Sequence, residues 1–101
     1  MALTTQTYAE QLGRMLAEAA RDESVVEEIW VSTRADGVDL WLLSQVIDAS
    51  KERALHGFID VLYARFKRSD FYVYVLNPRY FRGDPRSALP PHAVQIPFRV
   101  G

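Results

Sequence analysis

The sequence of 101 residues predicts an α/β fold of the α+β type, a two-layer sandwich with two helices on one face of a small sheet. Two segments carry apolar side chains every three or four residues, which is the period of a helix. Three shorter segments are rich in β-branched and aromatic residues and are typical of strands. Their order is helix, strand, strand, helix, strand. The length fits one domain, and a composition of 49% hydrophobic and 25% charged residues is typical of globular proteins.

Both predicted helices have one apolar and one polar side. The first is expected from about Thr5 to Asp22 and the second from about Asp48 to Lys67. The residues that share the apolar side of each helix are Tyr8, Leu12, Met15, Leu16 and Ala19 in the first, and Leu55, Phe58, Ile59, Leu62 and Phe66 in the second. Each helix therefore needs an apolar surface to cover, and one face of a sheet supplies it.

The first two strands, expected over residues 25–33 and 38–43, are predicted to form a hairpin. The dipeptide Asp36-Gly37 between them is typical of a two-residue type I′ turn, in which both turn residues need a positive φ. This turn would place Arg34 directly opposite Asp39. The sequence therefore predicts an ion pair across the two strands.

The alternation of side chains divides the three strands, the third expected over residues 71–76, between two faces. The residues predicted to face the helices are Ile29, Val31, Thr33, Val38, Leu40, Leu42, Phe71, Val73 and Val75. The opposite side is called here the aromatic face, and its large side chains are Trp30, Trp41, Leu43, Tyr72 and Tyr74. A monomer rarely exposes so large an apolar patch, so a second subunit, the chain's own tail or a ligand is expected to cover it.

Charge and proline content separate a body, residues 1–76, from a tail, residues 77–101. The body has eight Lys or Arg against twelve Asp or Glu, whereas the tail has four Arg against one Asp. All five prolines lie in the tail and exclude a long helix over residues 77–93. Residues 94–100 alternate, but Pro97 confines them to a sheet edge. Three tail cations are expected to pair with the acidic body, Glu27 and Glu28 included, in the same or a neighbouring subunit: Arg79, Arg82 and Arg86.

The order of elements over residues 5–76 and the segment 32–43 resemble the minimal nucleotidyltransferase family. That family has Gly-Ser-Arg after its first strand and Asp-hydrophobic-Asp on its second. The resemblance implies that Asp39 matches one of the paired aspartates and that Asp70 matches the third carboxylate, which together would hold Mg²⁺. Ser32-Thr33 stands in place of Gly-Ser and the second paired aspartate is absent, so the resemblance implies a degenerate, inactive relative.

These features predict a non-catalytic module without a cofactor, which forms a homodimer or binds a protein partner through the aromatic face. One alternative is a Mg²⁺-dependent, nucleotidyltransferase-like enzyme that uses Asp39 and Asp70. A second is binding of single-stranded nucleic acid, with bases stacked on the aromatic rings and phosphates held by the tail arginines. The negative charge of the body disfavours this second alternative.

The composition also limits the chemistry and the location that we expect. The chain has no cysteine, which excludes disulfides, cysteine-bound metals and thiol nucleophiles. No apolar run is long enough for a membrane helix, and no charged and apolar leader opens the sequence. We therefore expect a soluble, cytoplasmic protein that makes no membrane contact.

Overall fold

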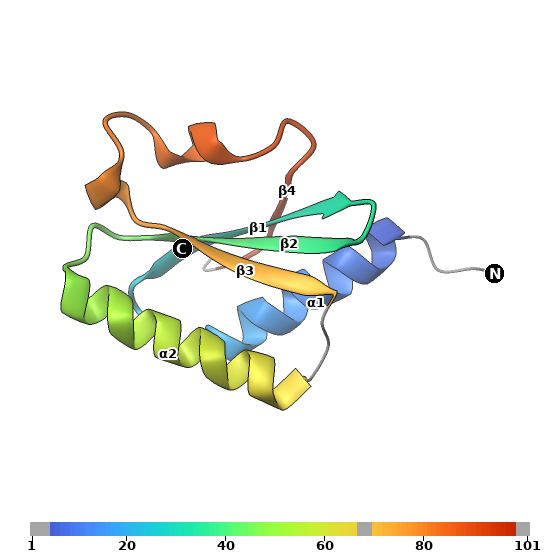
Figure 1. The fold of residues 1–101 in the computed structure, drawn as a ribbon, viewed down its shortest axis with the longest axis horizontal. Helices are drawn as coiled ribbons and strands as arrows, with labels where there is room; N and C mark the ends of the chain where they lie inside the picture. Colours follow the sequence, from blue (N-terminus) through green and yellow to red (C-terminus); the bar gives the residue numbers. More distant parts are fainter. Residues whose placement is uncertain (1–4, 67–69, 99–101) are drawn as a thin grey trace.

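The computed structural model describes residues 5–66 and 70–98. Two helices, α1 (Thr5–Ala19) and α2 (Ala49–Phe66), lie on one face of a four-stranded sheet (Figure 1). The strands are β1 (Val26–Arg34), β2 (Gly37–Ser44), β3 (Phe71–Leu76) and β4 (Val94–Ile96). The predicted order of helices and strands in the body and the two-layer α+β fold are thus confirmed.

The sheet has the order β3-β2-β1-β4. Strand β1 is antiparallel to both of its neighbours, whereas β2 and β3 are parallel because α2 returns the chain to the same end of the sheet. The tail supplies β4 as an edge strand, as its composition predicts. This strand ends at Ile96, immediately before Pro97, which has no N–H to donate to a ladder. Residues 99 and 100 of the predicted strand lie outside the described residues.

The predicted turn at Asp36-Gly37 is wrong. Arg34 lies opposite Gly37 and Ser32 lies opposite Asp39, so the two loop residues are Ala35 and Asp36. From Glu28 to Arg34, the partner of each β1 residue is therefore shifted by two positions along β2, and the register changes again between Val26 and Glu28. Because side chains alternate with a period of two, a shift of two leaves every side chain on its predicted face.

Gly37 is needed for close packing of two strands and not for a turn conformation. Its φ lies outside the left-handed range, but a Cβ at this position would lie 2.6 Å from the carbonyl oxygen of Asp70. The same carbonyl accepts a hydrogen bond of 2.9 Å from the N–H of Val38. Gly37 therefore allows the start of β3 to lie alongside the start of β2.

The hydrophobic core fills the space between the two helices and the sheet. The strand residues predicted to face the helices are buried or partly buried there, and Ile29, Leu40 and Leu42 have no exposed surface. Helix α1 lies close to β1 and β4, since a Cβ on Gly13 would lie 2.6 Å from Cγ1 of Ile96. Both helices thus cover the same sheet face, which leaves the other face to the tail.

The tail crosses the sheet on the face opposite the helices (Figure 1). It contains two short 3-10 helices, η1 (Pro78–Tyr80) and η2 (Pro85–Ala88), and each begins with proline. The side chains of Asn77 and Asp84 cap them by accepting a backbone hydrogen bond. The prolines therefore fit these turns, because the first N–H of a helix has no partner within the helix.

The tail is fixed where it begins by Asn77, whose side chain is buried and only 1% exposed. Its amide nitrogen donates to the carbonyl of Ile47 at 2.9 Å and to Glu52 at 3.3 Å. Its amide oxygen accepts from the N–H groups of Ile47 and Arg79, at 3.3 and 3.1 Å. One side chain thus connects the tail to the segment between β2 and α2.

None of the described helices is long and apolar enough to cross a bilayer.

Two glycine substitutions are expected to change stability in opposite directions. Gly37→Ala would place a Cβ against the Asp70 carbonyl and is expected to lower the free energy of unfolding by about 1–3 kcal/mol. Gly57→Ala, in the exposed middle of α2 where a Cβ would meet no atom outside its own helix turn within 4 Å, is expected to raise it by about 0.5–1 kcal/mol. Urea unfolding followed by tryptophan fluorescence measures both. Equal stability of the two variants would contradict the close approach at Gly37.

Candidate binding face

The chain's own tail covers part of the aromatic face. Trp30 and Trp41 lie directly opposite each other in the register, on the side away from the helices. Leu43, on the same side, is only 4% exposed, and Leu76 is 6% exposed. Because the helices lie on the other side of the sheet and the tail crosses this side (Figure 1), we infer that the tail buries these two leucines. The sequence led us to expect that a second subunit, the tail or a ligand covers the aromatic face. The tail covers one end of it.

The tail is held over β1 by an ion pair between Arg86 and Glu28. The Arg86 Nε donates to Glu28 Oε1 at 2.9 Å, and its Nη2 contacts Oε2. Glu28 Oε1 also accepts from the indole N–H of Trp30 at 2.9 Å. The hydrogen bond from Arg86 holds the pKa of Glu28 below its usual value against the opposing effect of burial. This pair confirms that a tail cation binds the acidic body, within one chain.

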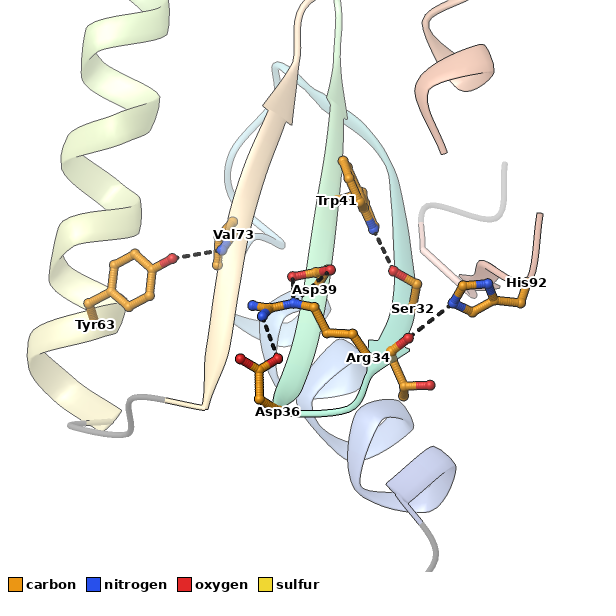
Figure 2. A network of polar contacts seen from close by, with 9 residues as sticks. Ser32, Arg34, Asp36, Asp39, Trp41, Tyr63, Val73 and His92 are labelled. Carbon is orange, nitrogen blue, oxygen red and sulfur yellow. Dashed lines mark hydrogen bonds and ion pairs between the residues drawn. The ribbon is translucent and has the colours of Figure 1, made fainter. Parts of the chain in front are cut away.

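A second tail contact lies further along β1. The Nε2 of His92, two residues before β4 begins, is 3.0 Å from the carbonyl oxygen of Thr33 (Figure 2). On the sheet itself, the Trp41 indole N–H donates to Ser32 Oγ at 2.9 Å. Ser32 is only 3% exposed, so this bond satisfies a buried hydroxyl and orients the indole ring.

The uncovered part of the aromatic face is a strip along β2 and β3. We call the three residues Trp41, Tyr72 and Tyr74 the aromatic strip. Tyr72 is 43% exposed and Tyr74 is 39% exposed, whereas Trp41 is partly buried. The rings of Trp41 and Tyr74 stack with their centroids 4.6 Å apart. Burial of its hydroxyl and the nearby Asp39 carboxylate raise the pKa of Tyr74. The strip is therefore open to solvent but held in one arrangement.

Arg34 borders the strip at the end nearest the β1–β2 turn. Its guanidinium lies 4.4 Å from the centre of the Tyr72 ring. Its Nε donates to both oxygens of Asp39, at 3.0 and 3.2 Å, and its Nη1 donates to Asp36 at 2.7 Å (Figure 2). Asp39 therefore raises the pKa of Arg34. The predicted Arg34–Asp39 ion pair is confirmed, although the two residues are diagonal neighbours and not direct partners.

One cation and two carboxylates leave this end of the strip with a net charge of −1. Arg34 pairs with both Asp36 and Asp39, so two carboxylates offset its positive charge. The charge near the stacked rings therefore disfavours a nucleic-acid backbone.

The two carboxylates assigned by the resemblance have partners in different layers. Asp39 binds Arg34 on the aromatic face. Asp70 precedes β3, and its Oδ1 accepts from the hydroxyl of Tyr8 in α1 at 3.3 Å. No group of three or more His, Asp or Glu able to hold a metal occurs among residues 5–66 and 70–98. The Mg²⁺-dependent alternative stays a prediction.

Basic side chains lie at the opposite end of β3. Arg79 and Arg82 follow this strand, and both are exposed. Tyr80, between them, is 62% exposed. The open strip thus has an acidic end at the turn and a basic end at η1.

The sequence interpretation missed the contact that Tyr63 makes with the edge of the sheet. The hydroxyl of Tyr63, in α2, accepts a hydrogen bond of 2.7 Å from the N–H of Val73 in β3 (Figure 2). The Tyr63 ring also stacks on Phe71, with centroids 5.2 Å apart. Its position four residues after Ile59 was the available signal, because that spacing places it beside the buried stripe of α2.

Acid is expected to release the tail near Trp30. A carboxylate whose pKa is lowered by folding stabilises the folded form above its usual value, 4.5 for Glu28, and loses this contribution as the pH falls through the lowered pKa. Protonated Glu28 no longer attracts Arg86, so tryptophan emission is expected to change below pH 4.5. The Glu28 carboxylate also lies near Asp84, whose pKa is lowered by a backbone hydrogen bond from Arg86 and by the Arg86 side chain.

The variant Glu28→Gln is expected to reduce this emission change, with Asp84→Asn as the matched control. Fluorescence from pH 7 to pH 3 measures it. The same profile in Glu28→Gln and the unaltered protein would show that another group controls the tail contact. Because the Arg86 side chain is 47% exposed, the ion pair is expected to contribute at most about 1 kcal/mol.

Comparison of the chain with protein-family models, with curated proteins and with solved structures found no match. The similarity to minimal nucleotidyltransferases therefore rests on the sequence features described above.

Proposed function

We propose that the protein is a non-catalytic module that associates with a second copy of itself through the aromatic strip. The observation that carries this proposal is the difference between the two ends of the aromatic face. Leu43 is only 4% exposed, yet Tyr72 and Tyr74 keep 43% and 39% of their surface exposed. The chain's own cover thus stops before the edge of the sheet.

The strip has the properties of a contact surface that is ready to bind. Tyrosine and tryptophan are enriched at the centres of protein interfaces, because they offer a large area with few rotatable bonds. Here Trp41 is fixed by Ser32 and Tyr74, and Tyr72 is fixed by Arg34. Little side-chain freedom remains to be lost when a partner binds, which favours association.

The exposed area indicates that this association is weak. An aromatic side chain buries roughly 150–250 Å², so the exposed fractions of Tyr72 and Tyr74 amount to on the order of 150 Å². A stable interface buries about 800 Å² on each partner. The strip is therefore the centre of a larger contact that includes neighbouring polar groups. We expect dissociation constants in the micromolar range or above.

The double variant Tyr72→Lys/Tyr74→Lys is expected to abolish self-association, because it places charged groups at the centre of the contact. Sedimentation equilibrium from micromolar to millimolar protein measures the mass. The matched control is Val61→Lys, on α2 in the other layer, where the side chain is already 62% exposed. Circular dichroism checks that the variants remain folded.

A monomer over the whole concentration range would overturn the proposal. So would an equal loss of association in Val61→Lys. The milder variant Tyr72→Ser provides a second test in case the double variant fails to fold. It removes the ring of the more exposed tyrosine without adding a charge, and weaker association than in the unaltered protein is expected.

A further inference from the structure

Strand β3 is the edge of the sheet opposite β4, and α2 covers part of it, since Phe71 is only 1% exposed. It has one neighbour, β2, and its six residues include no charged residue and no proline. Edge strands of this kind carry unpaired backbone groups and readily accept another strand, unless a protein blocks them with charges, prolines or a covering element. The neighbouring helix α2 reaches this edge through Tyr63.

The hydrogen bonds show which backbone groups of β3 point outward. The carbonyl of Asp70 accepts from Val38 of β2, so residue 70 and every second residue after it point toward β2. The N–H of Val73 instead donates to Tyr63. By the same alternation, the backbone groups of Phe71, Val73 and Val75 point away from the sheet. No hydrogen bond to the outward N–H of Phe71 or Val75 occurs within the described part of the chain.

These outward groups are self-complementary. Val73 is central in the outward set, with Phe71 two residues before it and Val75 two residues after it. In an antiparallel pair of β3 strands centred on Val73, each Val73 would face the other, and each Phe71 would face the Val75 of the second copy. Every outward N–H would then meet an outward carbonyl. A two-fold axis through this point satisfies both chains equally.

The side chains and charges favour the same antiparallel arrangement. Tyr72 of one copy would lie opposite Tyr74 of the other, which joins the two aromatic strips on one face. The acidic end of one copy, with Asp36 and Asp39, would approach the basic end of the other, with Arg79 and Arg82. A parallel pair would instead bring equal charges together.

We propose that β3 pairs with the β3 of a second copy in this antiparallel register, to form one continuous sheet of eight strands. In this arrangement the Tyr63 side chain has to move away from the edge, and we call this blocking role its guard function. Its hydroxyl accepts from the N–H of Val73, which in the pair would donate to the carbonyl of Val73 in the second copy. The inference rests on the proposed self-association and adds its geometry. A contact between the broad faces of two sheets is the competing arrangement.

Amide hydrogen exchange at low and high protein concentration tests the pairing directly. We expect the amides of Phe71 and Val75 to gain protection as the protein associates. The amides of Tyr72 and Tyr74 point toward β2 and serve as internal controls that stay constant. Association without a concentration-dependent change at Phe71 and Val75 would overturn the edge pairing, although the proposed self-association would remain.

The variant Tyr63→Phe is a second and independent test. Removal of the hydroxyl frees the N–H of Val73 in each copy, so association is expected to tighten by roughly two- to tenfold for each of the two hydrogen bonds that the symmetric pair gains. A structural role of Tyr63 alone would lower stability without tightening association. Tyr80→Phe, which removes an exposed hydroxyl in η1, is the matched control. Unchanged or weaker association in Tyr63→Phe would overturn the guard function.

Discussion

The close approach of two backbones at Gly37 determines where the aromatic strip forms. Without a side chain at Gly37, the Asp70 carbonyl can accept from Val38 and start β3 in register with β2. This register places Tyr72 beside Asp39 and Tyr74 beside Trp41. Both the stacked rings and the outward backbone groups of β3 therefore depend on Gly37. This glycine lies beside the start of β3, whereas the tail follows the end of β3.

The sequence was sufficient for the fold because its signals are local. Helix periodicity and strand alternation depend on neighbouring residues, so the two layers and both faces of the sheet could be predicted from them. The turn was misplaced because Asp36-Gly37 is a frequent turn dipeptide, whereas here Gly37 serves the contact with Asp70. That contact joins residues far apart in the sequence, and no local pattern reports it. The side chains still lie on their predicted faces, because the predicted register of β1 and β2 was wrong by an even number of residues.

The residues of the aromatic face could be predicted from the sequence, but the part of this face that the tail covers could not. Alternation alone placed the two tryptophans and two tyrosines on one face. Whether the tail folds back on its own body depends on the path of residues 77–93, which contain little periodic structure. The Arg86–Glu28 pair and the contact of His92 with Thr33 close that path over β1. Tyr63 and Val73 are only 10 residues apart in the sequence. Even so, no sequence pattern predicts that a helix side chain will bind the edge of a strand.

The buried side-chain amide of Asn77 joins the body to the tail by hydrogen bonds to both. Its hydrogen bonds satisfy both backbone polar groups of Ile47 and also the first turn of the tail. A chain shortened to the body would leave those groups of Ile47 buried without partners, and it would also lose β4 from the sheet. The tail is therefore an integral part of the fold, and separate expression of the two parts would not reproduce either of them.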